Sequence, residues 1–322
     1  MTRSKETVAA KRFGPNRIFW LLAKLAGTAI FLVLIARKVD LTAVLPIIRD
    51  CRWEWFFASI LLQYTAAVLG AMRWRMLWPL PGLPLHKYLY FVFLGNFFNV
   101  FLPSAALSDA VRVLAFGRKY GNIHENIGVN LLARGMGAVA QLLFAGGTAL
   151  VFYREWRDLR LPLNVRWDSG GIALIILLVA MLVGLWATRS KWRDWRWIRA
   201  MREVLANRGL AVKTFLLGLL LQITIAYATY ALFRSLYADA RFWHVACLVV
   251  LVQLALLVPL TAGGVGMREY LSLVFFSDIA GMPADVVLGV SLLGYLPFLL
   301  MALTGGGWML FRQIGRSGKE PA

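Results

Sequence analysis

Eight apolar segments separated by basic stretches constrain the fold of this chain more than any other feature of its sequence. They cover approximately residues 18–36, 53–72, 85–104, 127–153, 171–188, 210–233, 242–262 and 285–311. An apolar segment of about 17–25 residues can cross the roughly 30 Å hydrocarbon core of a bilayer. Because 60% of the 322 residues are hydrophobic and only 16% are charged, we predict an all-α polytopic integral membrane protein.

The remaining composition excludes several other classes of protein. The first segment follows a basic leader but lacks a small-x-small cleavage site, so we expect it to be retained as a helix. Cys51 and Cys247 belong to no CxxC motif, and neither a disulfide nor a metal site is expected. The formal net charge of +19 indicates contact with anionic membrane lipids, not with nucleic acid, in a chain this apolar.

Two ten-residue stretches interrupt corresponding segments of the two halves. Pro103–Arg112 reads PSAALSDAVR and Pro259–Arg268 reads PLTAGGVGMR, so each begins with Pro and ends with Arg. Broken helices in both halves of a membrane protein are typical of inverted-repeat transporters. Backbone interrupted at membrane depth is tolerated only where it lies in protein or lines a wet cavity. We therefore predict that segments 85–104 and 242–262 form re-entrant hairpins.

The distribution of Lys and Arg favours this topology. With a cytoplasmic N-terminus and two re-entrant hairpins, the cytoplasmic stretches hold 22 Lys and Arg and the outer stretches hold 10. Full crossing by all eight segments nearly removes this bias, contrary to the positive-inside rule. The membrane domain, 18–311, then consists of two inverted repeats, 18–153 and 171–311, with residues 1–17 and 312–322 in the cytoplasm. Its hairpins would meet near the midplane, where such proteins bind substrate.

The first broken segment offers five candidate substrate-binding residues. They are Asn96, Asn99, Ser104, Asp109 and Arg112. Asn96 and Asn99 are three apart and share one face of a helix, where they could line a polar groove or join helices. Asp109 could cap a helix that runs on to Arg118. Arg112 could bind a lipid phosphate through two hydrogen bonds or reach out to the membrane surface.

The second broken segment offers a glycine-rich turn followed by two ionisable residues. Gly263, Gly264 and Gly266 permit positive φ and could expose backbone N–H groups to an anionic head group. Arg268 and Glu269 begin a helical stretch, and ionisable residues at this depth usually have a function. The alternative is a tight turn with an interfacial ion pair.

Further polar residues lie in the other segments. Arg134 is the only charge in segment 127–153; it could neutralise Asp109, bind a phosphate or extend to the interface. Gln63, Gln141, Gln222 and Gln253 could join helices through amide hydrogen bonds or line a groove.

Residues 189–209 are predicted to form an amphipathic helix on the membrane surface. Its apolar face carries Trp192, Trp195, Ile198, Met201 and Leu205, and arginines flank this face.

No catalytic arrangement stands out. The three histidines lie apart without metal-ligand spacing, and there is no P-loop, GxGxxG or GxSxG motif. We therefore expect no cofactor and no metal, and Asp109 with Glu269 is the only candidate acid–base pair.

These motifs resemble the flippase-like membrane domain of the lysylphosphatidylglycerol synthase family. The similar residues are Arg73-Trp74, Gly95–Asn99 leading to Leu102-Pro103-Ser104, Asp109, Arg112 and Pro259–Glu269. The resemblance covers residues 18–311 and implies an inner-membrane protein that moves lipids between leaflets. The chain departs from the family pattern at Leu107-Ser108, where Gly-Gly is usual, and at Ala133, where Glu is frequent.

The sequence thus predicts a lipid translocase whose partners are membrane lipids with anionic or modified head groups. One alternative is an enzyme that acts on a polyprenyl-linked or phospholipid substrate, with Asp109 or Glu269 as its base. Another is a membrane scaffold.

Overall fold

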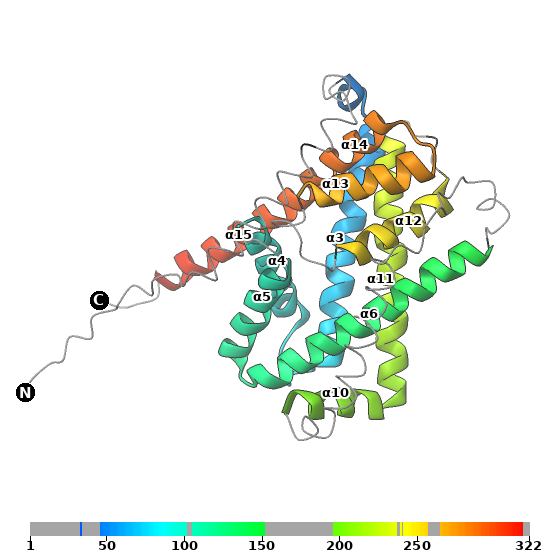
Figure 1. Ribbon diagram of the computed structural model, residues 1–322. Helices are drawn as coiled ribbons and strands as arrows, with labels where there is room; N and C mark the ends of the chain where they lie inside the picture. The colour runs from blue at the N-terminus through cyan, green and yellow to red at the C-terminus, as the bar shows by residue number, and fades with distance from the viewer. Residues whose placement is uncertain are drawn as a thin grey trace, which may run out of the picture.

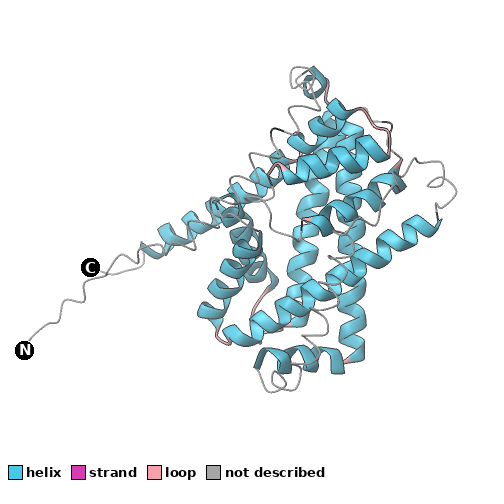
Figure 2. Ribbon diagram, viewed as in Figure 1, coloured by secondary structure: helices cyan, strands magenta, loops and turns pink. Residues whose placement is uncertain are grey.

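The computed structural model describes most of the chain, and all structural statements refer to this part. The described residues are 33, 46–101, 105–151, 196–236, 239, 241–256 and 265–317. Within these ranges every regular element is a helix, as Figure 2 shows. The predicted segment 171–188 and, apart from Val33, the predicted segment 18–36 lie outside the described residues.

Long apolar helices form the frame of the molecule (Figure 1). They are α3 (Trp53–Leu77), α6 (Ile123–Val151), α11 (Arg208–Ser235), and α14 (Ala284–Leu293) followed directly by α15 (Tyr295–Ser317). Four stretches within them are long and apolar enough to cross a bilayer, and they coincide with four of the predicted crossings. The prediction of an all-α polytopic membrane protein is confirmed.

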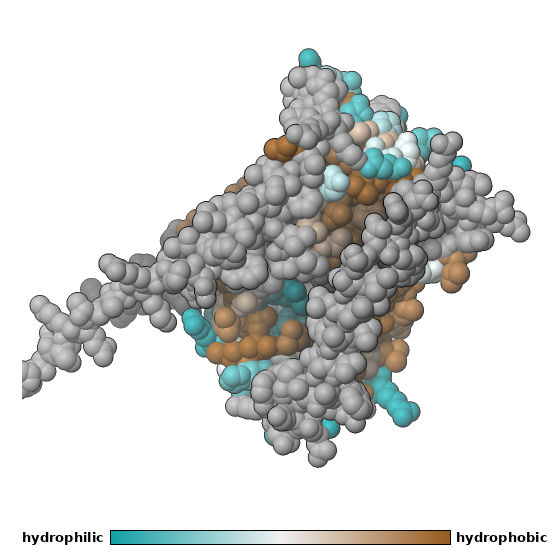
Figure 3. All heavy atoms as spheres, viewed as in Figure 1, coloured by the Kyte–Doolittle hydropathy of each residue, from teal (hydrophilic) through white to brown (hydrophobic). Residues whose placement is uncertain are grey.

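The outer surface of these helices is suited to lipid. Large apolar side chains are exposed on each of them, for example Leu61, Leu142, Leu216 and Leu303, and Leu150 is 78% exposed. Where described residues are visible in Figure 3, apolar ones lie mainly in the middle of the face, while hydrophilic ones lie at its upper and lower ends and in one group near the centre. An aqueous protein rarely exposes apolar surface this extensively, whereas a bilayer covers it.

The first broken segment forms an antiparallel pair of helices, α4 (Leu85–Phe101) and α5 (Ala105–Tyr120). The contacts between Phe91 and Phe116, at 5.0 Å between ring centroids, and between Asn99 and Ser108, at 2.8 Å, fix their register. Because α5 already begins at Ala105, Asp109 lies in its second turn. The prediction that Asp109 caps this helix is therefore wrong.

The second broken segment has the corresponding helix, α12 (Phe242–Ala255), and then α13 (Met267–Ser272), which continues into the π-helix η2 (Leu273–Ile279). Gly266 immediately precedes α13 with φ of 81°, a conformation that favours glycine. In both broken segments the helix ends close to the proline motif, as its sequence predicts.

The two parts of the chain pack across each other. α3 lies along α11, α4 packs on α15, and α12 packs on α6. Among the described glycines, Gly305 of α15 has the least space: an added Cβ would overlap the backbone carbonyl of Phe93 in α4. Small residues at helix crossings allow such close packing in membranes.

Residues 189–195 of the predicted amphipathic helix lie outside the described residues, and the part that is described packs partly on protein. α10 (Arg196–Ala206) is followed by Asn207, whose side chain accepts a hydrogen bond from the Leu210 N–H and thereby caps α11. α10 contacts α6, and Val204 is buried in this contact, while Leu205 is 52% exposed. Met201 of the predicted apolar face packs against the buried cluster that contains Val204, so this face contacts protein at Met201 and is exposed at Leu205.

Candidate functional site

A cavity of about 500 Å³ lies where the two broken segments approach α3, α11, α14 and α15. Such a volume is ordinary for a small-molecule site. Its wall is largely apolar and carries eight polar side chains. They are Gln63, Asn96, Arg112, Thr229, Gln253, Arg268, Ser272 and Ser291. Arg112 comes from the first half of the chain and Arg268 from the second, so both halves contribute a guanidinium to one cavity.

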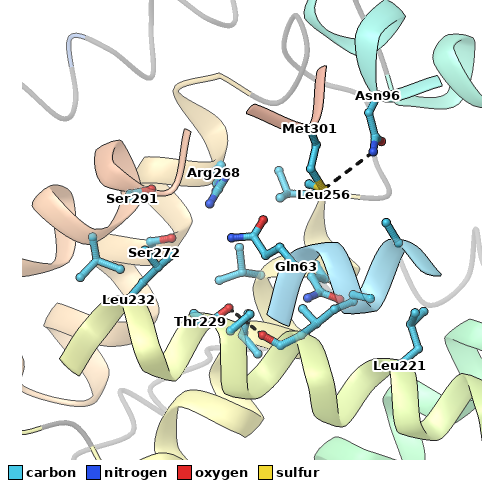
Figure 4. A pocket seen from close by; sticks show the side chains of 18 of the residues that line it. Gln63, Asn96, Leu221, Thr229, Leu232, Leu256, Arg268, Ser272, Ser291 and Met301 are labelled. Atoms are coloured by element: carbon cyan, nitrogen blue, oxygen red, sulfur yellow. Dashed lines mark hydrogen bonds between the residues drawn. The ribbon is translucent and has the colours of Figure 1, made fainter. Parts of the chain in front are cut away.

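Arg268 points into this cavity, toward the amide of Gln63 (Figure 4). Its guanidinium carbon lies 5.4 Å from the ring centroid of Tyr295, which is a cation–π contact. Among the described residues, no carboxylate lies within the 4.0 Å that defines an ion pair with Arg268. The geometry therefore leaves this cation available to an anion that enters the cavity.

Glu269, the next residue, is buried and is not among the residues that line the cavity. Its Oε2 accepts a hydrogen bond from the Gly266 N–H at 2.7 Å. Its Oε1 accepts from the Tyr295 hydroxyl at 2.7 Å and from the Ser291 hydroxyl at 3.4 Å. The carboxylate thus ties the turn before α13 to α14 and α15. The ion pair between Arg268 and Glu269, which was the alternative to a functional role for these residues, is not formed.

Arg112 belongs to a polar network that joins the first hairpin to α6 and α3. It pairs with Asp109 at 3.1 Å and donates to Asn130 Oδ1 at 3.4 Å. Its guanidinium carbon lies 5.1 Å from the centroid of the Trp74 ring. Asn126, which is fully buried, accepts a hydrogen bond from the Trp74 indole at 3.1 Å and so links this network to α3.

Arg134 completes the network on α6. It forms an ion pair with Asp109, so that one carboxylate bridges two arginines. Of the three roles that the sequence allows for Arg134, the structure shows the pairing with Asp109. Arg134 does not line the cavity.

Three glutamines connect helices beside the cavity. Gln253 Oε1 of α12 accepts from the Gln141 amide of α6 at 2.8 Å and from the Gln222 amide of α11 at 3.5 Å. Amide hydrogen bonds between membrane helices contribute about 0.6–2 kcal/mol each. Gln253 therefore both joins helices and lines the cavity.

Arg73 is buried near this site without lining it. Its Nη2 donates to the Ala133 carbonyl at 3.0 Å, and its guanidinium lies against Gly218 of α11. An added Cβ at Gly218 would come within 3.1–3.2 Å of three guanidinium atoms. A side chain at position 218 would therefore require the Arg73 guanidinium to shift by a few tenths of an ångström.

The remaining predicted site residues divide into three groups. Asn96 lines the cavity, whereas Asn99 accepts from Ser108 and holds the hairpin together. Gly266 forms the turn before α13. Ser104, Gly263 and Gly264 lie outside the described residues.

Sequence reasoning missed several polar residues around the cavity. Ser272, Ser291 and Tyr295 were not singled out, nor were Asn126 and Asn130. Their only signal is a polar side chain within or beside an apolar run. In the described part of the chain, no three His, Cys, Asp or Glu residues are placed to hold a metal ion.

Comparison with known proteins supports the resemblance found in the sequence. No curated protein matches the chain. Among protein families, the lysylphosphatidylglycerol synthase TM region matches residues 21–304, which is nearly the whole of the membrane domain. The chain therefore belongs to the family of the lysylphosphatidylglycerol synthase TM region.

Proposed function

We propose that this protein moves an amphipathic lipid between the two leaflets of the membrane. The observation that carries the proposal is the cavity in which Arg112 and Arg268, one from each half of the chain, line the same wall. A polar cavity inside an apolar bundle can shelter a head group while the acyl chains stay in hydrocarbon. The membrane fold and the family are consistent with a role in lipid metabolism or transport.

The packing supports an inverted repeat with two re-entrant hairpins. The second crossings of the two halves, α3 and α11, pack on each other. The broken helix of the first half, α4, packs on α15, and the broken helix of the second half, α12, packs on α6. A twofold relation between the halves would produce such reciprocal contacts. With the Lys and Arg bias, it favours cytoplasmic termini and hairpins that enter from opposite faces of a bacterial inner membrane.

In this proposal the three arginines attract the phosphate of the lipid. Arg268 and Arg112 contact it from the cavity wall, and Arg134 acts through Asp109, with which it is paired. Asp109 and Glu269 balance these charges or take up protons during transport. The lipid is one with an anionic or modified head group, consistent with the guanidinium groups in the wall.

Two observations favour translocation over catalysis. The enzyme alternative needs Asp109 or Glu269 as a base, yet Asp109 is held by two arginines and Glu269 by three hydrogen-bond donors. A general base must reach its substrate, and neither carboxylate lines the cavity.

The test is leaflet exchange in liposomes with a panel of labelled phospholipids and isoprenoid-linked lipids. We expect wild type to accelerate exchange of at least one lipid and Arg268→Ala to slow it. Arg75→Ala, at an exposed position in the last turn of α3, removes an equal charge away from the cavity and should behave as wild type. Exchange at the protein-free rate for every lipid would refute the proposal.

A further inference from the structure

The charges in the cavity wall are of one sign. Arg112 and Arg268 line it, and no Asp or Glu is among its lining residues in the described part of the chain. At a short distance, and with less screening than in water, such a wall attracts an anion and repels a cation. Which head group the cavity accepts therefore depends on whether any acidic group nearby could offset the arginines.

Glu269 and Asp109 contact the lining residues Ser291 and Arg112, and the carboxylate oxygens of both are engaged by the protein itself. Both oxygens of Glu269 accept hydrogen bonds, from Gly266 at 2.7 Å and from Tyr295 at 2.7 Å. Both oxygens of Asp109 contact arginines, Oδ1 that of Arg112 and Oδ2 that of Arg134. An ammonium group entering the cavity would meet no free carboxylate on these two residues, and burying an unpaired charge is costly.

The amide of Gln253 adds to this preference. Its oxygen already accepts hydrogen bonds from Gln141 and Gln222. Because an amide has one oxygen and one NH₂ group, the group of Gln253 that remains to serve a ligand is the NH₂ donor. A phosphate oxygen accepts such a hydrogen bond, whereas an ammonium group cannot.

From these contacts we infer that the cavity selects lipids whose head-group charge is carried by phosphate alone and rejects lipids that carry an ammonium group. Accepted head groups are phosphate esters or diphosphates with net negative charge. Rejected head groups include zwitterionic phosphoethanolamine and cationic aminoacyl esters. This inference rests on the proposed function, because it assumes that the cavity holds a lipid head group. It narrows the substrate class beyond anionic or modified lipids.

The cavity should show the same head-group preference in binding as in transport. Binding can be measured in detergent, where no bilayer is needed. Purified full-length protein would be titrated with dioctanoyl phosphatidic acid, phosphatidylglycerol, phosphatidylethanolamine and lysylphosphatidylglycerol, and binding followed by native mass spectrometry. These lipids share acyl chains and differ in head group. We expect phosphatidic acid and phosphatidylglycerol to bind at least tenfold more tightly than the two ammonium lipids.

Substitutions test whether the cavity wall is the source of this head-group selectivity. Arg268→Gln should weaken phosphatidic acid binding about tenfold, which corresponds to about 1.4 kcal/mol, and should narrow the difference from phosphatidylethanolamine. Arg75→Gln should preserve both affinities. Equal or tighter binding of lysylphosphatidylglycerol by wild type overturns the inference, as does Arg268→Gln with unchanged affinities.

The two proposals can fail separately. If liposome exchange accepts ammonium lipids as readily as phosphatidic acid, translocation stands and the selectivity is refuted. If no lipid is exchanged while the detergent titration retains its preference, the cavity binds anionic lipids but the protein does not translocate them.

Discussion

Three consecutive glycines in α15 give a test of the packing that closes the cavity. An added Cβ at Gly305 would overlap the Phe93 carbonyl, and one at Gly306 would lie 2.7 Å from the Phe97 ring. At Gly307 an added Cβ meets nothing within 4 Å. The same methyl group, placed at adjacent residues of one helix, is thus excluded at Gly305 and accommodated at Gly307.

The expected difference follows from two opposing effects. Replacement of a helical glycine by alanine stabilises the helix by up to about 1 kcal/mol, and this gain is common to both positions. At Gly305 the methyl group must also push α15 away from the backbone of α4, and overpacking of this kind costs about 1–3 kcal/mol or more. Gly305→Ala should therefore be less stable than Gly307→Ala by at least about 1–3 kcal/mol.

The assay is reversible unfolding in mixed micelles of dodecyl maltoside and sodium dodecyl sulfate, followed by tryptophan fluorescence. Gly307→Ala should match or exceed wild type, and Gly305→Ala should unfold at a lower detergent mole fraction. If both variants unfold at the same mole fraction, α15 does not approach α4 as closely as the structure shows, and the closure of the cavity on this side must be different.

Two further changes probe contacts around the cavity. Tyr295→Phe keeps the ring beside the cavity but removes a hydrogen bond to the buried carboxylate of Glu269, and hydrogen bonds to charged groups contribute about 1.5–3 kcal/mol. The same unfolding assay should show this loss of stability. The control is Tyr227→Phe, whose ring is half exposed and stacks on Phe242, and it should show no comparable loss. Equal stability of the two variants would contradict the hydrogen bond between Tyr295 and Glu269. Gly218→Leu would fill the space of the buried Arg73 guanidinium and should cost at least about 1–3 kcal/mol. Wild-type stability of this variant would show that Arg73 lies elsewhere.

The long helices and their interruptions could be predicted because each depends on local sequence. Apolar runs of sufficient length dictate helices in a bilayer, where backbone groups must bond within their own segment. The break after α4 follows from Pro103, which cannot donate a backbone hydrogen bond. The same argument places the break after α12 near Pro259, where the helix indeed ends by Ala255.

The arrangement of the site could be predicted only in part, because it depends on how helices rotate against each other. Asn96 and Asn99 share one face of α4, yet Asn96 reaches the cavity while Asn99 bonds to Ser108 of the neighbouring helix. Tyr295 lies 26 residues from Glu269, and no local pattern announces that they meet. Depth in the membrane identified Arg268 and Arg112 as candidates, but only the tertiary packing brings both to one cavity.

The most direct test of the account is the side of the membrane on which each hairpin begins and ends. Single cysteines would replace His86 and His124, at the ends of the first hairpin, and Asp239 and Pro283, at the ends of the second, in a protein whose native cysteines are replaced by alanine. All four positions are exposed. An impermeant thiol reagent should reach the first two only from the cytoplasm and the last two only from outside. Labelling the two ends of either hairpin from opposite sides would contradict the account.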